Sequence, residues 1–146
     1  MITLNYKIVI KAPKQKVWDV MLSDETYRAW TEAFSLGSYF KGNWEQGSEI
    51  EFLAPGPDGK EGGMYSRIAE NRPYDFVSIE HLGEINDGLK KPWTLGENIF
   101  ENYTFVDHNG ETELLIEMIG IPNEYQDSFE DMWPKALEKL KEIVEG

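Results

Sequence analysis

The chain contains no cysteine, few basic residues and no long apolar run. Without cysteine it can form no disulfide, zinc–thiolate site, iron–sulfur cluster or thiol nucleophile. Lysine and arginine number 14 against 27 aspartates and glutamates, which gives a net charge of −13 and disfavours nucleic acids and anionic membrane surfaces as partners. The longest apolar runs have three residues, as in Ile8-Val9-Ile10, which excludes a transmembrane helix and the core of a secretory signal. We therefore expect a cytoplasmic protein that does not insert into membranes.

Catalytic and metal-binding motifs are scarce as well. The sequence has no G-x-S-x-G elbow, P-loop, H-E-x-x-H motif or EF-hand loop. His81 and His108 are its only histidines, and zinc or iron sites favour several histidines. These absences predict that the chain needs no metal ion and no other cofactor.

The chain does contain enough apolar material for a folded core. Apolar residues make up 40% of its 146 residues and aromatic residues 13%, which excludes intrinsic disorder. This length favours a single domain over residues 1–146.

Hydropathy patterns predict a strand, two short helices, six further strands and a long helix, in that order. Alternating apolar and polar residues over Met1–Lys11 indicate the first strand, and Pro13 suits the first turn of the helix that follows. The second short helix covers Glu25–Trp30. Asn109-Gly110 predicts a hairpin, because a type I′ turn needs a positive φ at both central residues. The six further strands are predicted at Ser38–Lys41, Glu49–Leu53, Gly63–Glu70, Phe76–Glu84, Asn98–Val106 and Thr112–Ile119.

The last segment, Asn123–Glu145, has the clearest helical pattern. Pro134 lies inside this pattern and predicts a kink. Consecutive strands favour an antiparallel meander, and only a sheet offers the helix a partner large enough to cover its apolar stripe. The predicted fold is therefore α+β, with a curved antiparallel sheet wrapped around the long C-terminal helix. The stripe consists of Phe129, Trp133, Ala136, Leu137, Leu140 and Val144.

Residues spread along the whole chain match the pattern of a known family. They are Ala12-Pro13, Val17-Trp18, Trp30-Thr31, Phe34, Gly42-Asn43-Trp44, Gly47-Ser48, the run from Gly59 to Tyr65, Pro73, His81-Leu82-Gly83-Glu84, Glu101-Asn102-Tyr103, Gly110, Thr112, Leu114, Trp133-Pro134 and Ala136-Leu137. In this order they resemble the helix-grip fold of the START-like (SRPBCC, birch-pollen-allergen) superfamily. Within it, the chain resembles the bacterial branch related to the C-terminal domain of the activator of the 90-kDa heat-shock protein ATPase.

The resemblance implies a cavity between the helix and the sheet. The superfamily holds lipid carriers, polyketide cyclases, hormone receptors and co-chaperone domains, and the shared feature is that cavity. The resemblance also implies a link to chaperones and the stress response. The activators use an additional N-terminal domain that this sequence does not contain, which weakens the expectation of ATPase activation. A shared fold does not fix the function.

Aromatic side chains are the main candidates for ligand contacts. Trp30, Phe34, Phe40 and Trp93 lie at element ends or in loops, where the mouths of pockets form. Since aromatic residues also dominate ordinary cores, simple core filling is the alternative, and it is the expected role of Trp18. Trp44, in the turn between Gly42 and Gly47, is predicted to be exposed. The predicted ligand-binding residues are Trp30, Phe34, Phe40, Phe52, Met64, His81, Trp93, Tyr103, Phe105, Met118, Phe129 and Trp133.

One polar group of residues is compatible with catalysis. His81 shares its side of a strand with Val77 and Ile79, and Glu101 and Tyr103 share one side of another strand. His81, Glu101 and Tyr103 are therefore the candidate catalytic residues. The alternatives are a hydrogen-bonded core histidine and a strand-end glutamate that reaches water or an arginine.

Three functions stay open. The first is a small binding protein that holds a hydrophobic small molecule, such as a lipid, an aromatic or a polyketide-like compound, in the cavity. The second is a chaperone-linked protein-interaction domain, whose acidic surface suits a basic partner. The third, which we favour less, is a cyclase or hydrolase that uses Glu101, Tyr103 or His81.

Overall fold

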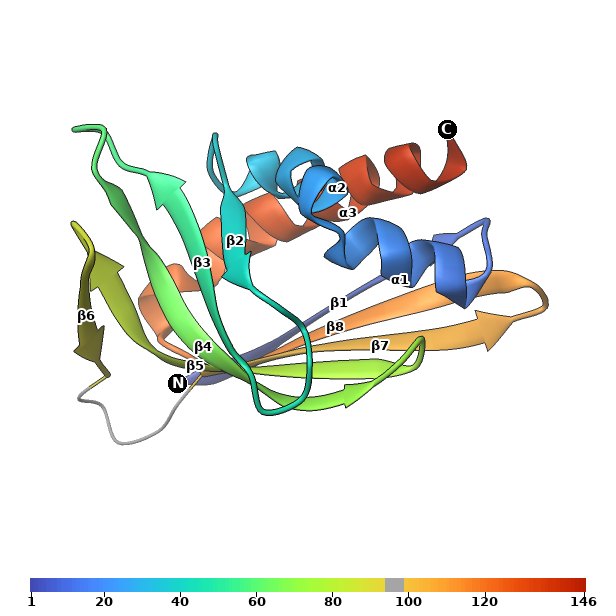
Figure 1. Ribbon diagram of the computed structural model, residues 1–146. Coiled ribbons are helices and arrows are strands. Elements are labelled where there is room, and N and C mark those ends of the chain that lie inside the picture. The colour runs from blue at the N-terminus through green and yellow to red at the C-terminus, as the bar shows by residue number, and fades with distance from the viewer. Residues whose placement is uncertain (94–98) are drawn as a thin grey trace.

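An antiparallel sheet of eight strands forms most of this computed structural model, which describes residues 1–93 and 99–146. The strand order is β1-β8-β7-β5-β4-β3-β2, and β6 pairs with the end of β5. Figure 1 shows that β2–β6 curl toward the helices at one end of the molecule. The strands are β1 (Ile2–Ile10), β2 (Tyr39–Gly42), β3 (Glu49–Pro55), β4 (Glu61–Arg72), β5 (Phe76–Asn86), β6 (Leu89–Pro92), β7 (Ile99–His108) and β8 (Glu111–Ile121).

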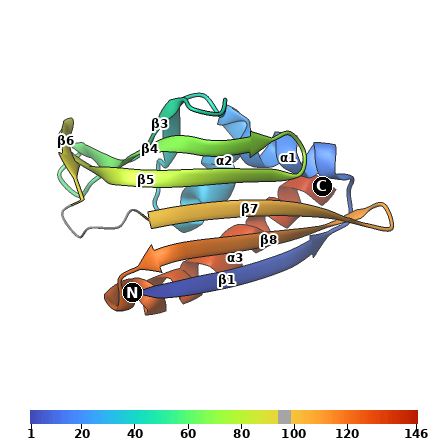
Figure 2. The ribbon, with the colours of Figure 1, turned by 90° about the horizontal axis from the view of Figure 1, so that it is seen from below.

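The helices cover one face of this sheet (Figure 2). Between β1 and β2 lie α1 (Lys14–Leu22), α2 (Asp24–Trp30) and a 3₁₀ turn, η1 (Thr31–Ala33). A second 3₁₀ turn, η2 (Asn123–Tyr125), leads into α3 (Gln126–Glu145). Among residues 1–93 and 99–146, none of the helices combines the length and the apolar character that a membrane span requires.

The α+β fold predicted from the sequence is confirmed, including the two short helices after the first strand. The Asn109-Gly110 turn has the positive φ angles expected of it, 56° and 87°. The sequence reading missed β6, although Asp87-Gly88 carries the same turn signal and has φ angles of 53° and 79°. Asn98, the first residue of one predicted strand, lies outside the described residues.

The long helix begins three residues later than predicted, because Asn123–Tyr125 forms the 3₁₀ turn instead. It then continues through Pro134, and the kink expected there stays a prediction. Its buried residues are those of the predicted stripe except Phe129, which is partly buried: Trp133, Ala136, Leu137, Leu140 and Val144.

The two ends of α3 pack differently, and this difference positions the site. From Ala136 to Val144 the buried stripe is at most 2% exposed and belongs to the same core cluster as Val17 and Leu114. Around the first turns of α3, the curled strands β3–β5 wall a cavity instead of a solid core.

Gly63, on β4, lets β3 and β4 approach closely beside this cavity. Its φ is 156°, and a Cβ at this position would lie 1.8 Å from the carbonyl oxygen of Phe52. Backbone atoms cannot yield as a flexible side chain can, so only glycine fits without moving a strand.

We expect Gly63→Ala to lower the free energy of unfolding by about 3 kcal/mol, since it combines strained φ with backbone overlap. Gly88→Ala is the matched control: Gly88 also has a positive φ, 79°, but a Cβ there would meet nothing within 4 Å. The control should cost about 1 kcal/mol. Chemical denaturation of both variants measures the difference, and equal losses would show that the close approach at Gly63 does not constrain the fold.

Candidate functional site

A cavity of about 500 Å³ lies between the first turns of α3 and the concave face of the sheet. This volume is within the range of small-molecule sites. Its walls come from α2 and η1, from the strands β3, β4, β5, β7 and β8, and from η2 and α3. Exposed residues at its mouth include Met1, Glu124 and Tyr125.

Ten of the twelve ligand-binding residues predicted from the sequence line this cavity. Their role in binding stays a prediction, but the fold does bring them together. They are Trp30, Phe34, Phe52, Met64, His81, Trp93, Tyr103, Met118, Phe129 and Trp133.

The structure places the other two predicted residues elsewhere. Phe40 packs edge-on against Tyr27, with ring centroids 5.1 Å apart, and lies behind the cavity wall. Phe105 shares the side of β7 that faces the helices, but it lies further along the strand and packs on Trp18 at 5.1 Å. Strand alternation tells which face a residue occupies and not how far along the strand a cavity extends.

Trp44 also differs from expectation. It is half-buried, and its ring lies 5.4 Å from that of Phe40 and 5.7 Å from that of Phe52. The Trp44 ring therefore packs on Phe40 and Phe52 and is not part of the cavity lining. Nothing in the Gly42–Gly47 pattern predicts this burial.

The sequence reading missed several lining residues. Tyr27 comes from α2, one turn before Trp30, so helical periodicity could have found it. Thr31 and Ser38 follow α2, and Met132 precedes Trp133, where no pattern distinguishes them from ordinary surface or core residues.

Trp133 is the central aromatic residue of the cavity wall. Its ring stacks on Tyr6 at 6.1 Å and meets Phe34 edge-on at 4.8 Å and Tyr103 at 6.2 Å. Its indole N–H donates to the sulfur of Met118 at 2.8 Å. The N–H is thus satisfied without water, and the ring can face an apolar space.

A chain of polar side chains crosses the cavity wall at β4, β5 and β7. The hydroxyl oxygen of Ser66 lies 2.6 Å from His81 Nδ1, and His81 Nε2 lies 3.0 Å from Glu101 Oε1. The hydroxyl of Tyr103 donates to Glu101 Oε2. His81, Glu101 and Tyr103 therefore form the cluster that strand alternation predicted, with Ser66 as an additional member that it missed.

The carboxylate of Glu101 determines which groups of this cluster donate hydrogen bonds. A carboxylate only accepts hydrogen bonds, so Glu101 takes the Nε2–H of His81 and the O–H of Tyr103. Nδ1 of His81 is then free to accept the O–H of Ser66. Each buried polar atom of the cluster gains a partner, as the low dielectric of the interior requires.

Burial raises the pKa of Tyr27 and of Tyr103 well above the usual value, and the nearby charge of Glu101 adds to the effect. Both hydroxyls therefore stay protonated in the folded chain. An unfolded chain exposes them to water and lets them ionise at their ordinary pKa of 10.0. Their contribution to stability is thus complete below about pH 10 and is lost as the pH rises further.

We expect tyrosinate absorbance to rise in two phases during an alkaline titration, with the later phase coinciding with loss of near-ultraviolet circular dichroism. Tyr103→Phe should reduce only the later phase, because that hydroxyl ionises when the chain unfolds. Tyr125→Phe, at an exposed position, should leave the later phase unchanged. Loss of early amplitude in Tyr103→Phe would contradict the buried, protonated state of this hydroxyl.

Similar solved structures share this fold. The solution structure of the Aha1 dimer from Colwellia psychrerythraea has a TM-score of 0.76 at 17% identity, and the match covers 99% of this chain and 96% of that one. Protein CV1439 from Chromobacterium violaceum has a TM-score of 0.73 at 20% identity over 99% and 97% of the two chains. DynU16, a protein of the dynemicin biosynthetic locus, has a TM-score of 0.70 at 13% identity over 98% of this chain and 47% of its own. At these identities the likeness shows the fold alone.

A comparison with protein families shows more than a shared fold. No curated protein matches the chain. The model of the family described as "Activator of Hsp90 ATPase homolog 1-like protein" matches residues 11–145, which is nearly the whole chain and includes most of the cavity wall. The chain belongs to this family, within the SRPBCC superfamily.

Proposed function

We propose that this protein binds a hydrophobic small molecule in the cavity between α3 and the sheet. The observation that carries the proposal is the cavity itself: about 500 Å³, with a wall in which many side chains are aromatic or contain sulfur, and with one hydrogen-bonded polar cluster on its inner surface. This combination of an apolar wall and a few placed polar groups is typical of small-molecule sites.

The expected affinity follows from the apolar surface that a ligand would bury. Burying roughly 300 Å² of apolar ligand surface contributes about 7 kcal/mol. Because the loss of ligand freedom on binding offsets part of this, we expect a dissociation constant on the order of 10 μM or weaker. Lipids, aromatic compounds and polyketide-like compounds fit this description. The similar fold of DynU16, from a biosynthetic locus, is compatible with the last of these. We include in the proposal a cytoplasmic location and activity without a metal ion or other cofactor.

The family name points to an alternative, a chaperone-linked protein-interaction domain, and with it a role in the stress response. Such a domain needs a surface and not a hollow interior. Native mass spectrometry of the purified protein separates the two functions, since a binding protein should retain or take up one small molecule per chain.

The polar cluster supports a second candidate function, acid–base chemistry on a bound molecule. Glu101 lines the cavity and accepts hydrogen bonds from both His81 and Tyr103, so the cluster could hold and move a proton beside a ligand. Turnover of a trial substrate with a bell-shaped pH profile that Tyr103→Phe abolishes would support this function, whereas turnover that is unchanged in Tyr103→Phe would exclude these residues as its basis.

We expect Nile red, a neutral apolar dye, to bind saturably at one site per chain with a dissociation constant in the micromolar range. Trp133→Ala should weaken binding by more than tenfold, because the indole forms the centre of the cavity wall. It should also lower the free energy of unfolding, by about 3 kcal/mol, as loss of a buried tryptophan does.

Trp18→Ala is the matched control for this experiment. Trp18 is also buried, but it packs on Phe105 and Tyr74 away from the cavity. It should lose similar stability and keep the affinity for Nile red. Equal losses of affinity in the two variants, or no saturable binding by the unmodified chain, would favour the protein-interaction alternative.

A further inference from the structure

The charged side chains that line the cavity are acidic. Glu84, Glu101 and Glu124 contribute to the lining, and no lysine or arginine does so in the described part of the chain. Residues 94–98 contain no lysine or arginine in their sequence either. Since charges interact strongly in a partly buried space, this lining disfavours an anionic ligand.

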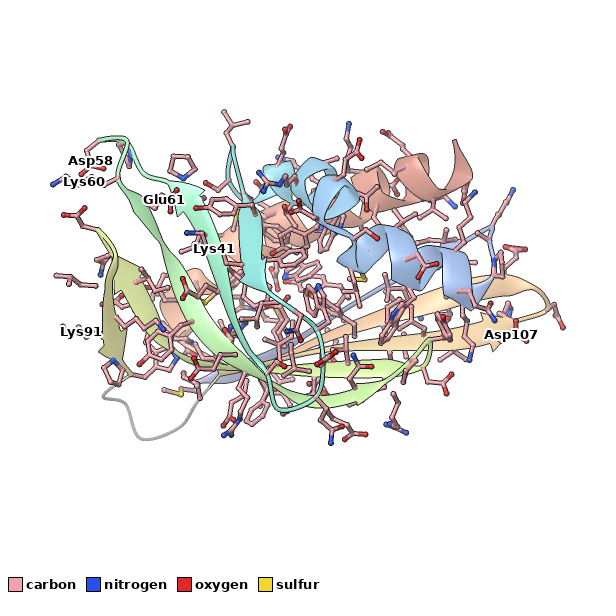
Figure 3. The ribbon with its side chains drawn as sticks, in the orientation of Figure 1. Lys41, Asp58, Lys60, Glu61, Lys91 and Asp107 are labelled. Carbon is pink, nitrogen blue, oxygen red and sulfur yellow. The ribbon has the colours of Figure 1, made fainter. Side chains whose placement is uncertain are left out.

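The basic side chains at this end of the molecule are directed elsewhere. Lys60 pairs with Asp87 at 3.4 Å, and Lys90 lies 3.6 Å from a carboxylate oxygen of Glu51. Figure 3 shows Lys60 and Lys91 projecting outward from the β3–β4 turn and from β6. They do not neutralise the carboxylates inside.

Most side-chain hydrogen-bond donors on the inner wall of the cavity are already used. The hydroxyl of Thr31 donates to the carbonyl of Tyr27 at 2.6 Å. One hydrogen bond joins the hydroxyls of Tyr27 and Ser38 and uses one of their two donors. The indole N–H groups of the three lining tryptophans are all occupied: Trp30 donates to the carbonyl of Met21 at 2.9 Å, Trp93 to the carbonyl of His81 at 3.0 Å, and Trp133 to the sulfur of Met118 at 2.8 Å.

The acceptors, in contrast, have capacity left. A carboxylate offers about four lone-pair sites, and His81 and Tyr103 occupy only two on Glu101. The oxygen of Tyr103 can accept as well. A ligand that donates hydrogen bonds therefore finds partners, whereas a carboxylate ligand would leave its own charge unpaired, which is costly in a partly buried site.

From this asymmetry we propose that the cavity selects hydrophobic molecules that carry a protonated amine and rejects those that carry a carboxylate. This inference rests on the proposed binding function and deepens it. The ammonium group donates to Glu101, and the apolar body lies against the rings of Phe34, Phe52 and Trp133. Aromatic faces attract cations as well as apolar groups, so the walls favour the same class of ligand.

Three probes with one skeleton test this selectivity: 2-(1-naphthyl)ethylammonium, 2-(1-naphthyl)ethanol and 1-naphthylacetate, each in competition with bound Nile red at neutral pH. The ammonium should bind at least about tenfold more tightly than the acetate, as expected for hydrogen bonds to a charged group, and the alcohol should lie between them. Acetate binding as tight as ammonium binding would overturn the inference. If none of the three probes binds, the proposed function itself fails; if the alcohol binds as tightly as the ammonium, only the inference fails.

Substitutions then locate the source of the selectivity. Glu101→Gln keeps the shape and removes the charge, so it should weaken ammonium binding about tenfold and change alcohol binding less than about twofold. Asp107→Asn is the matched control, since Asp107 lies at the opposite end of the molecule (Figure 3) and its substitution removes the same charge. Equal effects of the two substitutions would show attraction to the general acidic surface and contradict the inference.

Glu101 belongs to a buried network, so its variant must first be checked for folding by circular dichroism. Glu124→Gln provides the second test, because Glu124 is exposed at the mouth of the cavity and its loss leaves the core intact. We expect it to weaken ammonium binding about twofold to threefold, more so at low ionic strength, and to leave alcohol binding unchanged. No change in ammonium binding in either variant would overturn the inference.

Discussion

The fit of Trp133 between α3 and the sheet is the contact on which the rest of the structure depends. On one side of this indole, α3 closes tightly over the sheet through Ala136, Leu140 and Val144. On the other side lies the cavity, walled by the first turns of α3 and by the strands of the curled end of the sheet. The same ring therefore ends the solid core and begins the cavity wall. A protein interior normally fills such space with side chains, and the proposed binding function accounts for a hollow of this size beside a well-packed core.

The polar cluster shows how an acidic group can lie in such a wall. Glu101 is only partly exposed, and it is held by the hydrogen bonds of His81 and Tyr103, while His81 is held in turn by Ser66. These partners compensate for the loss of water around the carboxylate. They also fix the direction of each donor, with the result that the cavity offers acceptors to a ligand and few donors. In the proposed binding function, the specificity of the site depends on how the hydrogen bonds of the wall are distributed as well as on its shape.

Much of this arrangement could be predicted from the sequence, but not its extent. Period-two alternation placed His81, Glu101 and Tyr103 on the concave face, and the stripe of α3 placed Trp133 against the sheet, because both patterns depend on local geometry. The position of Phe105 outside the cavity depends on where the sheet bends, and the burial of Trp44 depends on contacts between distant segments. Neither leaves a local signal. Ser66 and Tyr27 were missed for a different reason: a serine on a strand and a tyrosine on a short helix become informative only when their partners across the fold are known.

The methionines allow the most direct measurement of the central claim, that a hydrophobic molecule binds in the cavity and not on the surface. Met64, Met118 and Met132 line the cavity, whereas Met21 is fully buried in the core beyond it. In a chain labelled with ¹³C at the methionine methyl groups, titration with 2-(1-naphthyl)ethanol should shift the signals of Met64, Met118 and Met132 and give intermolecular nuclear Overhauser effects to them, while the signal of Met21 stays in place. Saturable binding that leaves these three signals unchanged, or that produces no contact with Met118, would contradict the account.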